Sequence, residues 1–303
     1  MKWDDFRQSD NVEDRRGSSG GGGGPIRIGG AGGLGLGGIV VVLLISYFTG
    51  ISPQTLLGGL EMINGGGSGP TISQPEEPSA PPSDRVGTFV AKVLGSTEDT
   101  WTTIFQDQVG SNYEAPRLVL FTGGTRSACG AADSAMGPFY CPNDQRVYLD
   151  TSFFQEMKTR FQACPPGSDA CEFAQAYVVA HEIGHHVQNL LGILPKVHEA
   201  RQNASEVESN ALSVRTELQA DCFAGVWAFN ADKRWRFLEP GDVEAALQTA
   251  SAIGDDMLQR RSRGVVVPDS FTHGSSAQRQ RWFLAGLKKG QLDACNTFSA
   301  RQL

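Results

Sequence analysis

The sequence lacks several patterns that define common protein classes. Its globular part has no block of Lys and Arg, and the 303-residue chain has a net charge of -7, so it carries no electrostatic footprint for nucleic acid. It has no Cys-x-x-Cys pair, which argues against a zinc site built from thiolates. It has no internal repeat either. The chain is long enough for one sizeable domain with room for a small one beside it.

Charged residues are absent between Arg27 and Glu61. This gap contains an apolar run over residues 34–51, close to the roughly 20 apolar residues that a bilayer core requires. The run predicts a single transmembrane anchor. A cleavable signal peptide fits less well, because the leader before the run is long and no Ala-x-Ala site follows it. A buried core helix fits less well because Gly-rich sequence flanks the run.

The cations around this run predict its orientation. Lys and Arg are present before it and absent after it until Arg85, and cations favour the cytoplasmic side. We therefore expect a flexible cytoplasmic segment over 1–33, the anchor over 34–51 and a Gly/Pro-rich linker over 52–84. The folded domain, 85–303, would lie in the periplasm or exterior, held by the anchor to the inner (cytoplasmic) membrane.

All six cysteines follow the predicted anchor, and their number is even. An exported domain can oxidise them to disulfides. We pair cysteines that are neighbours in the sequence, which predicts the disulfides Cys129–Cys141 and Cys164–Cys171. The two remaining cysteines then form the third predicted disulfide, Cys222–Cys295.

The local patterns of the domain predict an α+β fold that is mostly helical, with a small sheet towards its N-terminal side. Residues 117–121 are expected to form a strand, residues 122–132 a Gly-rich loop, and residues 137–140 and 146–150 a strand pair. The main expected helices cover residues 85–108, 152–161, 169–191, 205–230, 243–259 and 275–289.

The helix over 169–191 contains the segment His181-Glu182-Ile183-Gly184-His185. Two histidines four residues apart lie on the same side of a helix, so both imidazoles can bind one metal ion. Glu182 can reach a metal-bound water as a general base without binding the metal, which is the arrangement of zinc peptidases. The preceding residues are apolar, and buried ionisable groups are costly unless they are paired or bound to a metal. The segment therefore predicts a Zn²⁺-dependent peptidase, and Gly184 leaves room for another element to approach the metal.

A catalytic zinc needs a third protein ligand. One family pattern has a third histidine at the position that Leu191 occupies here, so that pattern is excluded. Glu217 and Asp221 share one face of the helix over 205–230, and neighbouring small residues allow this helix to pack closely. We predict Glu217 as the third ligand and Asp221 as the acceptor of the other ring N–H of a ligand histidine. Weaker alternatives are His186, which points away from the metal, His198, which follows Pro195 in a polar loop, and Glu206 and Glu208, which lie among polar residues.

His273 lies in a loop just before the helix over 275–289. We predict that it stabilises the oxyanion or binds substrate, because a His, Tyr or Arg usually assists zinc in this role. The segment over 137–150 could supply the edge strand along which an extended peptide substrate lies.

Several motifs together resemble the neutral zinc metallopeptidase family of bacteria. They are the N-terminal segment Met1–Arg7, the Gly-rich segment before the apolar run, the metal-binding helix, Glu-Leu-Gln-Ala-Asp-Cys at 217–222, and Thr-His-Gly-Ser at 272–275. The resemblance covers nearly the whole chain. It implies a zincin-like fold with Glu217 as third ligand, and it names no substrate.

Two functions remain as hypotheses. The first is a membrane-anchored zinc endopeptidase that hydrolyses a protein or peptide substrate. The second is a non-catalytic zincin-like binding or scaffold protein of the cell envelope. The presence of Glu182 favours the first, because a purely structural metal site needs no base.

Overall fold

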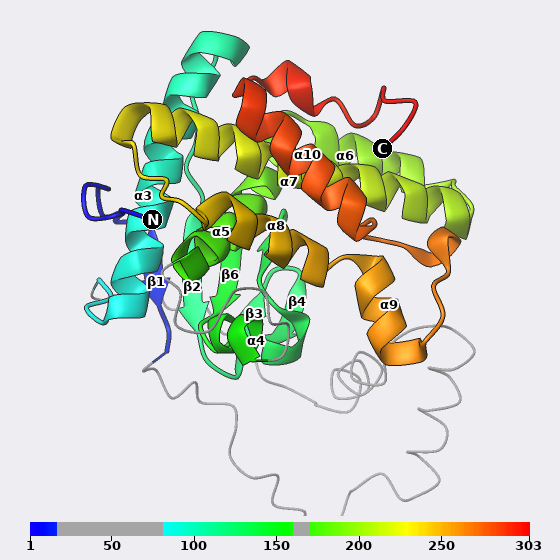
Figure 1. Cartoon of the computed structure of the whole chain (residues 1–303), viewed down its shortest axis with the longest axis horizontal. Helices are drawn as coiled ribbons and strands as arrows, with labels where there is room; N and C mark the ends of the chain where they lie inside the picture. The colour runs from blue at the N-terminus through cyan, green and yellow to red at the C-terminus, as the bar shows by residue number, and fades with distance from the viewer. Residues whose placement is uncertain (17–80, 160–169) are drawn as a thin grey trace, which may run out of the picture. The chain divides into compact units, whose positions relative to one another are not determined.

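Helices form most of the residues that the computed structural model describes, which are residues 1–16, 81–159 and 170–303. This confirms the α+β, mostly helical class. Figure 1 shows α7 lying between α5 and α10. The described helices are α3 (Arg85–Ile104), α4 (Phe153–Thr159), α5 (Ala170–Leu190), α6 (Ile193–Gln202), α7 (Glu206–Trp235), α8 (Asp242–Ala252), α9 (Asp255–Arg263) and α10 (Ser276–Lys289).

The main sheet has the strand order β1-β2-β6-β5. β1, β2 and β6 are parallel, whereas β5 runs antiparallel to β6 and forms an edge. The predicted strand at 117–121 and the predicted strand pair are confirmed. The strands are β1 (Val12–Asp14), β2 (Arg117–Phe121), β5 (Phe139–Cys141) and β6 (Arg146–Asp150).

Three local expectations are wrong, and one of them is the polar loop around His198, which is helix α6. The expected loop over 122–132 contains an antiparallel hairpin, β3 (Gly124–Ser127) and β4 (Gly130–Asp133). Its residues are mostly small or polar, so the sequence lacks the apolar alternation that usually indicates a strand. The expected helix over 243–259 is two helices, because the chain turns at Gly254. A Cβ atom at Gly254 would lie 2.6 Å from the Ser276 backbone nitrogen, so this tight turn requires glycine.

Two of the predicted disulfides are confirmed, Cys129–Cys141 and Cys222–Cys295. The first joins the turn between β3 and β4 to the edge strand β5, and the second joins α7 to the C-terminal segment. The third predicted pair includes Cys164, which lies outside the described residues.

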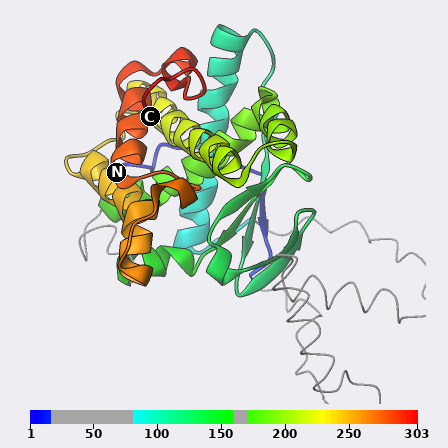
Figure 2. The same ribbon diagram turned by 90° about the vertical axis from the view of Figure 1, so that its right-hand side faces the viewer.

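The segment Met1–Arg16 packs against the rest of the fold. β1 adds to the edge of the main sheet beside β2, as Figure 2 shows in blue. Phe6 is 3% exposed and meets the rings of Trp235 and Phe237 edge-on. Gly95 of α3 touches the Arg7 backbone so closely that no Cβ atom would fit there.

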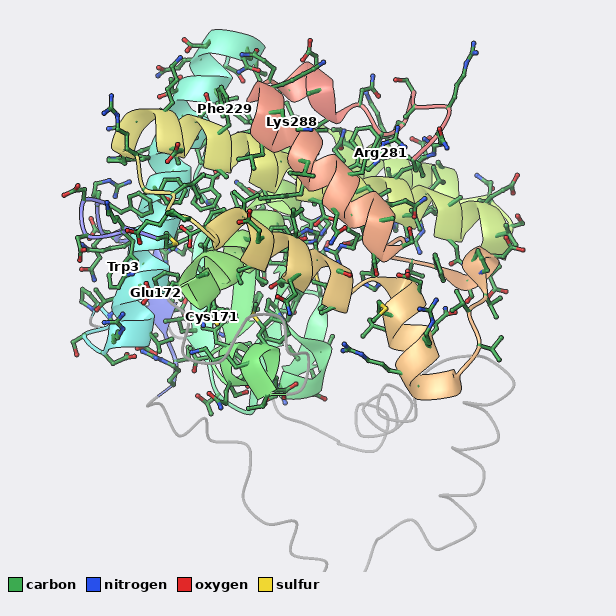
Figure 3. The ribbon with its side chains drawn as sticks, viewed as in Figure 1. Trp3, Cys171, Glu172, Phe229, Arg281 and Lys288 are labelled. Carbon is green, nitrogen blue, oxygen red and sulfur yellow. A yellow bond between two sulfur atoms is a disulfide. The ribbon has the colours of Figure 1, made fainter. Side chains whose placement is uncertain are left out.

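Polar contacts hold the same segment. The buried Glu98 carboxylate of α3 accepts hydrogen bonds from Arg7, Ser9 and Asn11 at 2.6, 2.6 and 2.8 Å. The Trp3 indole donates to Glu172 at 2.7 Å, and these two side chains lie close together in Figure 3. The expectation of a flexible segment over 1–33 is therefore wrong for Met1–Arg16. The few apolar residues of Met1–Arg16 show no periodicity, and the residues that they pack against lie far along the chain. The sequence pattern of this segment therefore does not indicate that it is folded.

These contacts also bear on the predicted membrane orientation. That orientation requires Met1–Arg16 in the cytoplasm and the domain over 85–303 outside, and the contacts between the two are not compatible with such a separation. The anchor predicted over 34–51 lies outside the described residues. Within the ranges that the structure does describe, no helix is both long and apolar enough to span a membrane.

We predict that Phe6→Ala lowers the free energy of unfolding by about 3–5 kcal/mol, because it leaves a cavity between Trp235 and Phe237. Urea denaturation of the full chain measures this. Gln8→Ala is the control; Gln8 is exposed in the same segment, and a change within about 0.5 kcal/mol is expected. Equal stability of the two variants would mean that Met1–Arg16 does not pack on the domain.

Candidate metal centre

α5 and α7 pack side by side and bring three predicted ligands together. Glu217 on α7 faces both histidines of α5: its Oε2 lies 3.1 Å from His181 Nε2, and its Oε1 lies 3.5 Å from His185 Nε2. One ligand atom from each residue falls within 4.8 Å of the others. The approach depends on Gly184, because a Cβ atom there would lie 2.9 Å from the Ala220 carbonyl oxygen. The predicted role of Gly184 in close packing thus has a structural counterpart.

The three residues lie in a cleft of about 550 Å³. Glu182 and His273 line the same cleft, so it holds all the predicted ligands and catalytic residues. The residues from Met136 to Tyr140, which include the start of edge strand β5, form part of its wall. The rest of the lining is largely apolar and includes Phe153, Val178, Leu194, Ile253 and Leu258.

Asp221, the predicted support, is fully buried beside His181. The ring Nδ1 of His181 donates to its carboxylate at 2.8 Å, which leaves Nε2 facing Glu217. Tyr177 donates to the same carboxylate at 2.5 Å. Arg279 of α10 donates hydrogen bonds to both carboxylate oxygens of Asp221, at 2.8 and 2.9 Å. Asp221 therefore orients one ligand and is itself held on two other sides.

Burial and neighbouring charge oppose each other in this network. Burial lowers the pKa of His181, but the charge and hydrogen bond of Asp221 outweigh it and raise the pKa to about 10. Burial raises the pKa of Asp221, but Arg279 and His181 outweigh it and lower the pKa to about 2. Burial likewise raises the pKa of Glu217, and the two facing histidines bring it well below its usual range. Both carboxylates are therefore ionised at neutral pH.

Glu182 differs from the other buried carboxylates. It is 7% exposed and lines the cleft, yet no residue in the described part of the chain makes a hydrogen bond to it. His273 is half exposed, and its Nδ1 is held by Asp255 at 3.2 Å. Its Nε2 is thereby left as the ring nitrogen that can act on a bound molecule.

The weaker alternatives lie elsewhere. His186 is buried and faces away from the cleft: Nε2 donates to the Glu114 carbonyl oxygen at 2.6 Å, and Nδ1 accepts from Tyr140 at 3.0 Å. Burial lowers the pKa of His186 to about 4, so its ring is neutral. His198 is exposed on α6, a helix where a polar loop was expected, and contacts Gln202. Glu206 and Glu208 are exposed at the start of α7.

Three residues that the sequence analysis missed complete the centre. Tyr177 precedes His181 by one helical turn and so lies on the same face of α5. Arg279 stands on the buried stripe of α10, three residues before Trp282 and four before Phe283. Gln188, one turn after His185, accepts from its Nδ1 at 2.9 Å. A polar residue on an otherwise buried helix face was the signal available for all three.

The donor set fits a zinc ion. It consists of two imidazole nitrogens and one carboxylate oxygen, and each histidine has its other nitrogen held by a neighbouring side chain. Hard cations such as Ca²⁺ and Mg²⁺ would instead require mostly oxygen ligands.

Comparison with known proteins agrees with this donor set. The model of the family described as "Putative neutral zinc metallopeptidase" matches residues 1–298. The chain belongs to this family. Uncharacterized protein YpfJ of Escherichia coli K12 is 49% identical over 304 residues, which are 98% of this chain and 99% of that protein. Uncharacterized protein Rv2575 of Mycobacterium tuberculosis H37Rv is 46% identical over 200 residues, 63% of this chain and 65% of that protein. No solved structure gives a significant match.

The resemblance noted in the sequence is thus confirmed as membership of the zinc metallopeptidase family. The matched region includes Met1–Arg16 as well as α5, α7 and α10. The family model therefore spans both the N-terminal segment and the metal centre, which the structure places in one compact unit.

We predict that Arg279→Met lowers the free energy of unfolding by about 3–5 kcal/mol, because it removes the guanidinium that pairs both oxygens of the buried Asp221 carboxylate. Arg281→Met is the control: Arg281 lies on the same helix but is exposed and labelled in Figure 3. Urea denaturation of both variants checks this. A loss for Arg279→Met no larger than for Arg281→Met would rule out the pair as a stabilising contact.

Proposed function

We propose that this protein is a zinc-dependent peptidase. The observation that carries the proposal is the cluster of His181, His185 and Glu217 in the wall of a cleft that Glu182 also lines. Three ligands for one ion, with a carboxylate beside them in the same cleft, are the groups that a zinc-activated water requires. The zincin-like fold and the ligand roles of the three clustered residues are part of the same proposal.

Each residue of the site has its own role in the proposed reaction. His181, His185 and Glu217 would hold a zinc ion, which would supply Lewis-acid activation. Glu182 would act as the general base, accepting the proton of the attacking water on its carboxylate and passing it to the amine nitrogen that leaves. His273 donates from Nε2 to the oxyanion that develops at the scissile carbonyl, while Asp255 holds Nδ1. Asp221 keeps His181 in the tautomer that presents Nε2.

The substrate is proposed to be an extended peptide. Strand β5 lies at the edge of the main sheet, and Phe139 and Tyr140 of this strand line the cleft beside the metal centre. A peptide can add to such an edge through backbone hydrogen bonds and place its side chains in the apolar lining. The cleft is open enough at about 550 Å³ to admit part of a chain.

The compartment is proposed to be outside the cytoplasm, with attachment to the inner membrane through residues 34–51. The disulfides Cys129–Cys141 and Cys222–Cys295 support an oxidising compartment. Met1–Arg16 would lie on the same side as the metal centre, because it is packed on the domain. Residues 34–51 would then enter and leave the membrane on that same face instead of crossing it once. This replaces the expectations of a single transmembrane crossing and of a cytoplasmic N-terminus.

The alternative of a non-catalytic scaffold is weaker. A structural zinc site is closed by protein ligands, whereas this cluster offers three ligands and faces a cleft. A scaffold would also give Glu182 a structural partner.

We predict that Glu182→Gln lowers peptide hydrolysis by about 10²- to 10⁴-fold while zinc remains bound, because the amide cannot accept the proton. Cleavage of a generic protein substrate and metal analysis are measured on the same sample. Glu244→Gln, an exposed carboxylate on α8, is the control. Glu217→Ala is expected to lose the zinc itself. Unchanged hydrolysis in Glu182→Gln would refute its role as the base.

We predict that Asp255→Asn moves the alkaline limit of peptidase activity to lower pH. The hydrogen bond that His273 donates to Asp255 raises the pKa of His273, so the charged ring persists to higher pH and can stabilise an oxyanion. Without the carboxylate, the ring loses its proton sooner as the pH rises. The pH profile of kcat/KM measures this, with Asp269→Asn as an exposed control. A profile unchanged in both variants would show that the charge of His273 is not used.

A further inference from the structure

The ring of His185 is connected to a chain of buried amides. Its Nδ1 lies 2.9 Å from Gln188 Oε1, and Gln188 is fully buried on α5. The Gln188 Nε2 lies 2.7 Å from the Thr216 carbonyl oxygen and 3.0 Å from Gln219 Oε1. The Gln219 Nε2 lies 2.9 Å from the Cys295 carbonyl oxygen.

Two backbone carbonyls fix the polarity of this chain. A carbonyl oxygen can only accept, so the Thr216 and Cys295 carbonyls each require the amide nitrogen of a glutamine to face them. Gln188 must then turn its oxygen, which also can only accept, towards His185. The ring of His185 must therefore carry its proton on Nδ1, and Nε2 is left free to face Glu217.

We propose that Gln188 and Gln219 are positioning residues for His185, setting its tautomer and ring orientation for the metal. This inference rests on the proposed role of His185 as a zinc ligand. The pair does for His185 what Asp221 does for His181, but with neutral groups.

Part of this hydrogen-bond chain, which we call the relay, lies on α7, the helix that supplies Glu217. Thr216 and Gln219 flank Glu217 on α7, so the relay ties the His185 ring to the same backbone as the Glu217 carboxylate. The Cys222–Cys295 disulfide joins the far end of the relay to α7 as well. The positions of two ligands are thus coupled through one set of hydrogen bonds.

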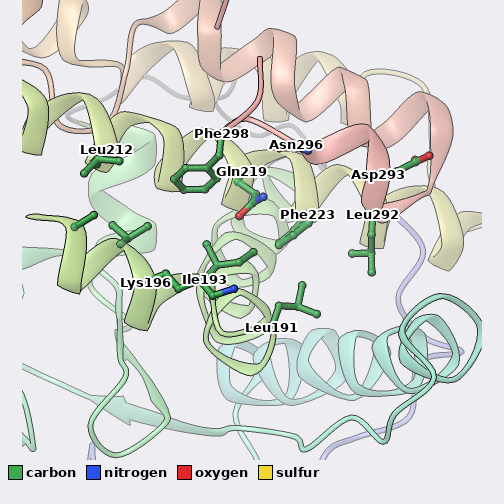
Figure 4. Close-up of a pocket in the computed structure, with 12 residues that line it drawn as sticks. Leu191, Ile193, Lys196, Leu212, Gln219, Phe223, Leu292, Asp293, Asn296 and Phe298 are labelled. Carbon is green, nitrogen blue, oxygen red and sulfur yellow. The ribbon is translucent and has the colours of Figure 1, made fainter. Parts of the chain in front are cut away.

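Most of the relay is buried. Gln188 is fully buried, and Gln219 is 6% exposed where it lines a second cavity, whose largely apolar wall includes Phe223, Leu212 and Phe298 (Figure 4). In such surroundings an unpaired amide is costly, so each group keeps its partner.

The test replaces the amides by methionine, which has a similar length and no amide. Zinc affinity is measured by competition with a chelator, and the ring N–H signals of isotope-labelled histidine are recorded on the zinc-loaded protein. We expect Gln188→Met to weaken zinc binding by about 10- to 100-fold and to abolish the slowly exchanging Nδ1–H signal of His185. Gln219→Met should weaken it less, because Thr216 still holds Gln188. The Nδ1–H signal of His181 should persist in both variants.

Gln280→Met is the matched control, since its amide makes one hydrogen bond to the Leu247 carbonyl oxygen on α8. It should change neither measurement. If Gln188→Met does not fold, the test rests on Gln219→Met. An unchanged zinc affinity together with an unchanged His185 Nδ1–H signal in Gln219→Met would overturn the relay. If the unmodified protein binds no zinc, the proposed function fails. Zinc binding that is equal in the unmodified protein and in both relay variants overturns only the relay.

Discussion

The metal centre depends on the close contact of helix backbones on both sides of α7. On one side, Gly184 of α5 meets Ala220. On the other, Gly225 of α7 and Gly286 of α10 touch the opposing backbones so closely that a Cβ atom at either would collide with them. These contacts place α7 within reach of both neighbours. Ligands from α5 and α7, and the arginine of α10, can therefore converge with short side chains.

This convergence places charged side chains in the interior, and neighbouring side chains balance each charge. Asp221 is ionised in the interior because Arg279 and His181 face it and Tyr177 donates to it. Neutral amides perform the matching task around His185. The Glu182 carboxylate stands apart from both networks among the described residues, which is the arrangement expected if its partner is a reacting water rather than the protein.

Much of the site was predictable, for reasons that particular residues illustrate. His181 and His185 are one helical turn apart, so the period of the helix alone places both rings on one side. Glu217 could be ranked first because small residues follow it on its helix. Arg279 was not found, because nothing local connects it with Asp221, 58 positions away in the chain. Met1–Arg16 was misassigned for the same reason: Phe6 packs on Trp235 and Phe237, which its own neighbourhood does not reveal.

The sequence by itself determined the spacing of the metal motif, the family, the helical character of the domain and two of the disulfides. These follow from local periodicity, from cysteine order or from motifs matched along the chain. Only the tertiary structure decided which groups hold Asp221 and His185, which strand of the main sheet lines the cleft, and that the N-terminal segment is part of the folded unit. Those outcomes depend on contacts between distant residues, where burial and hydrogen bonding across helices determine the arrangement.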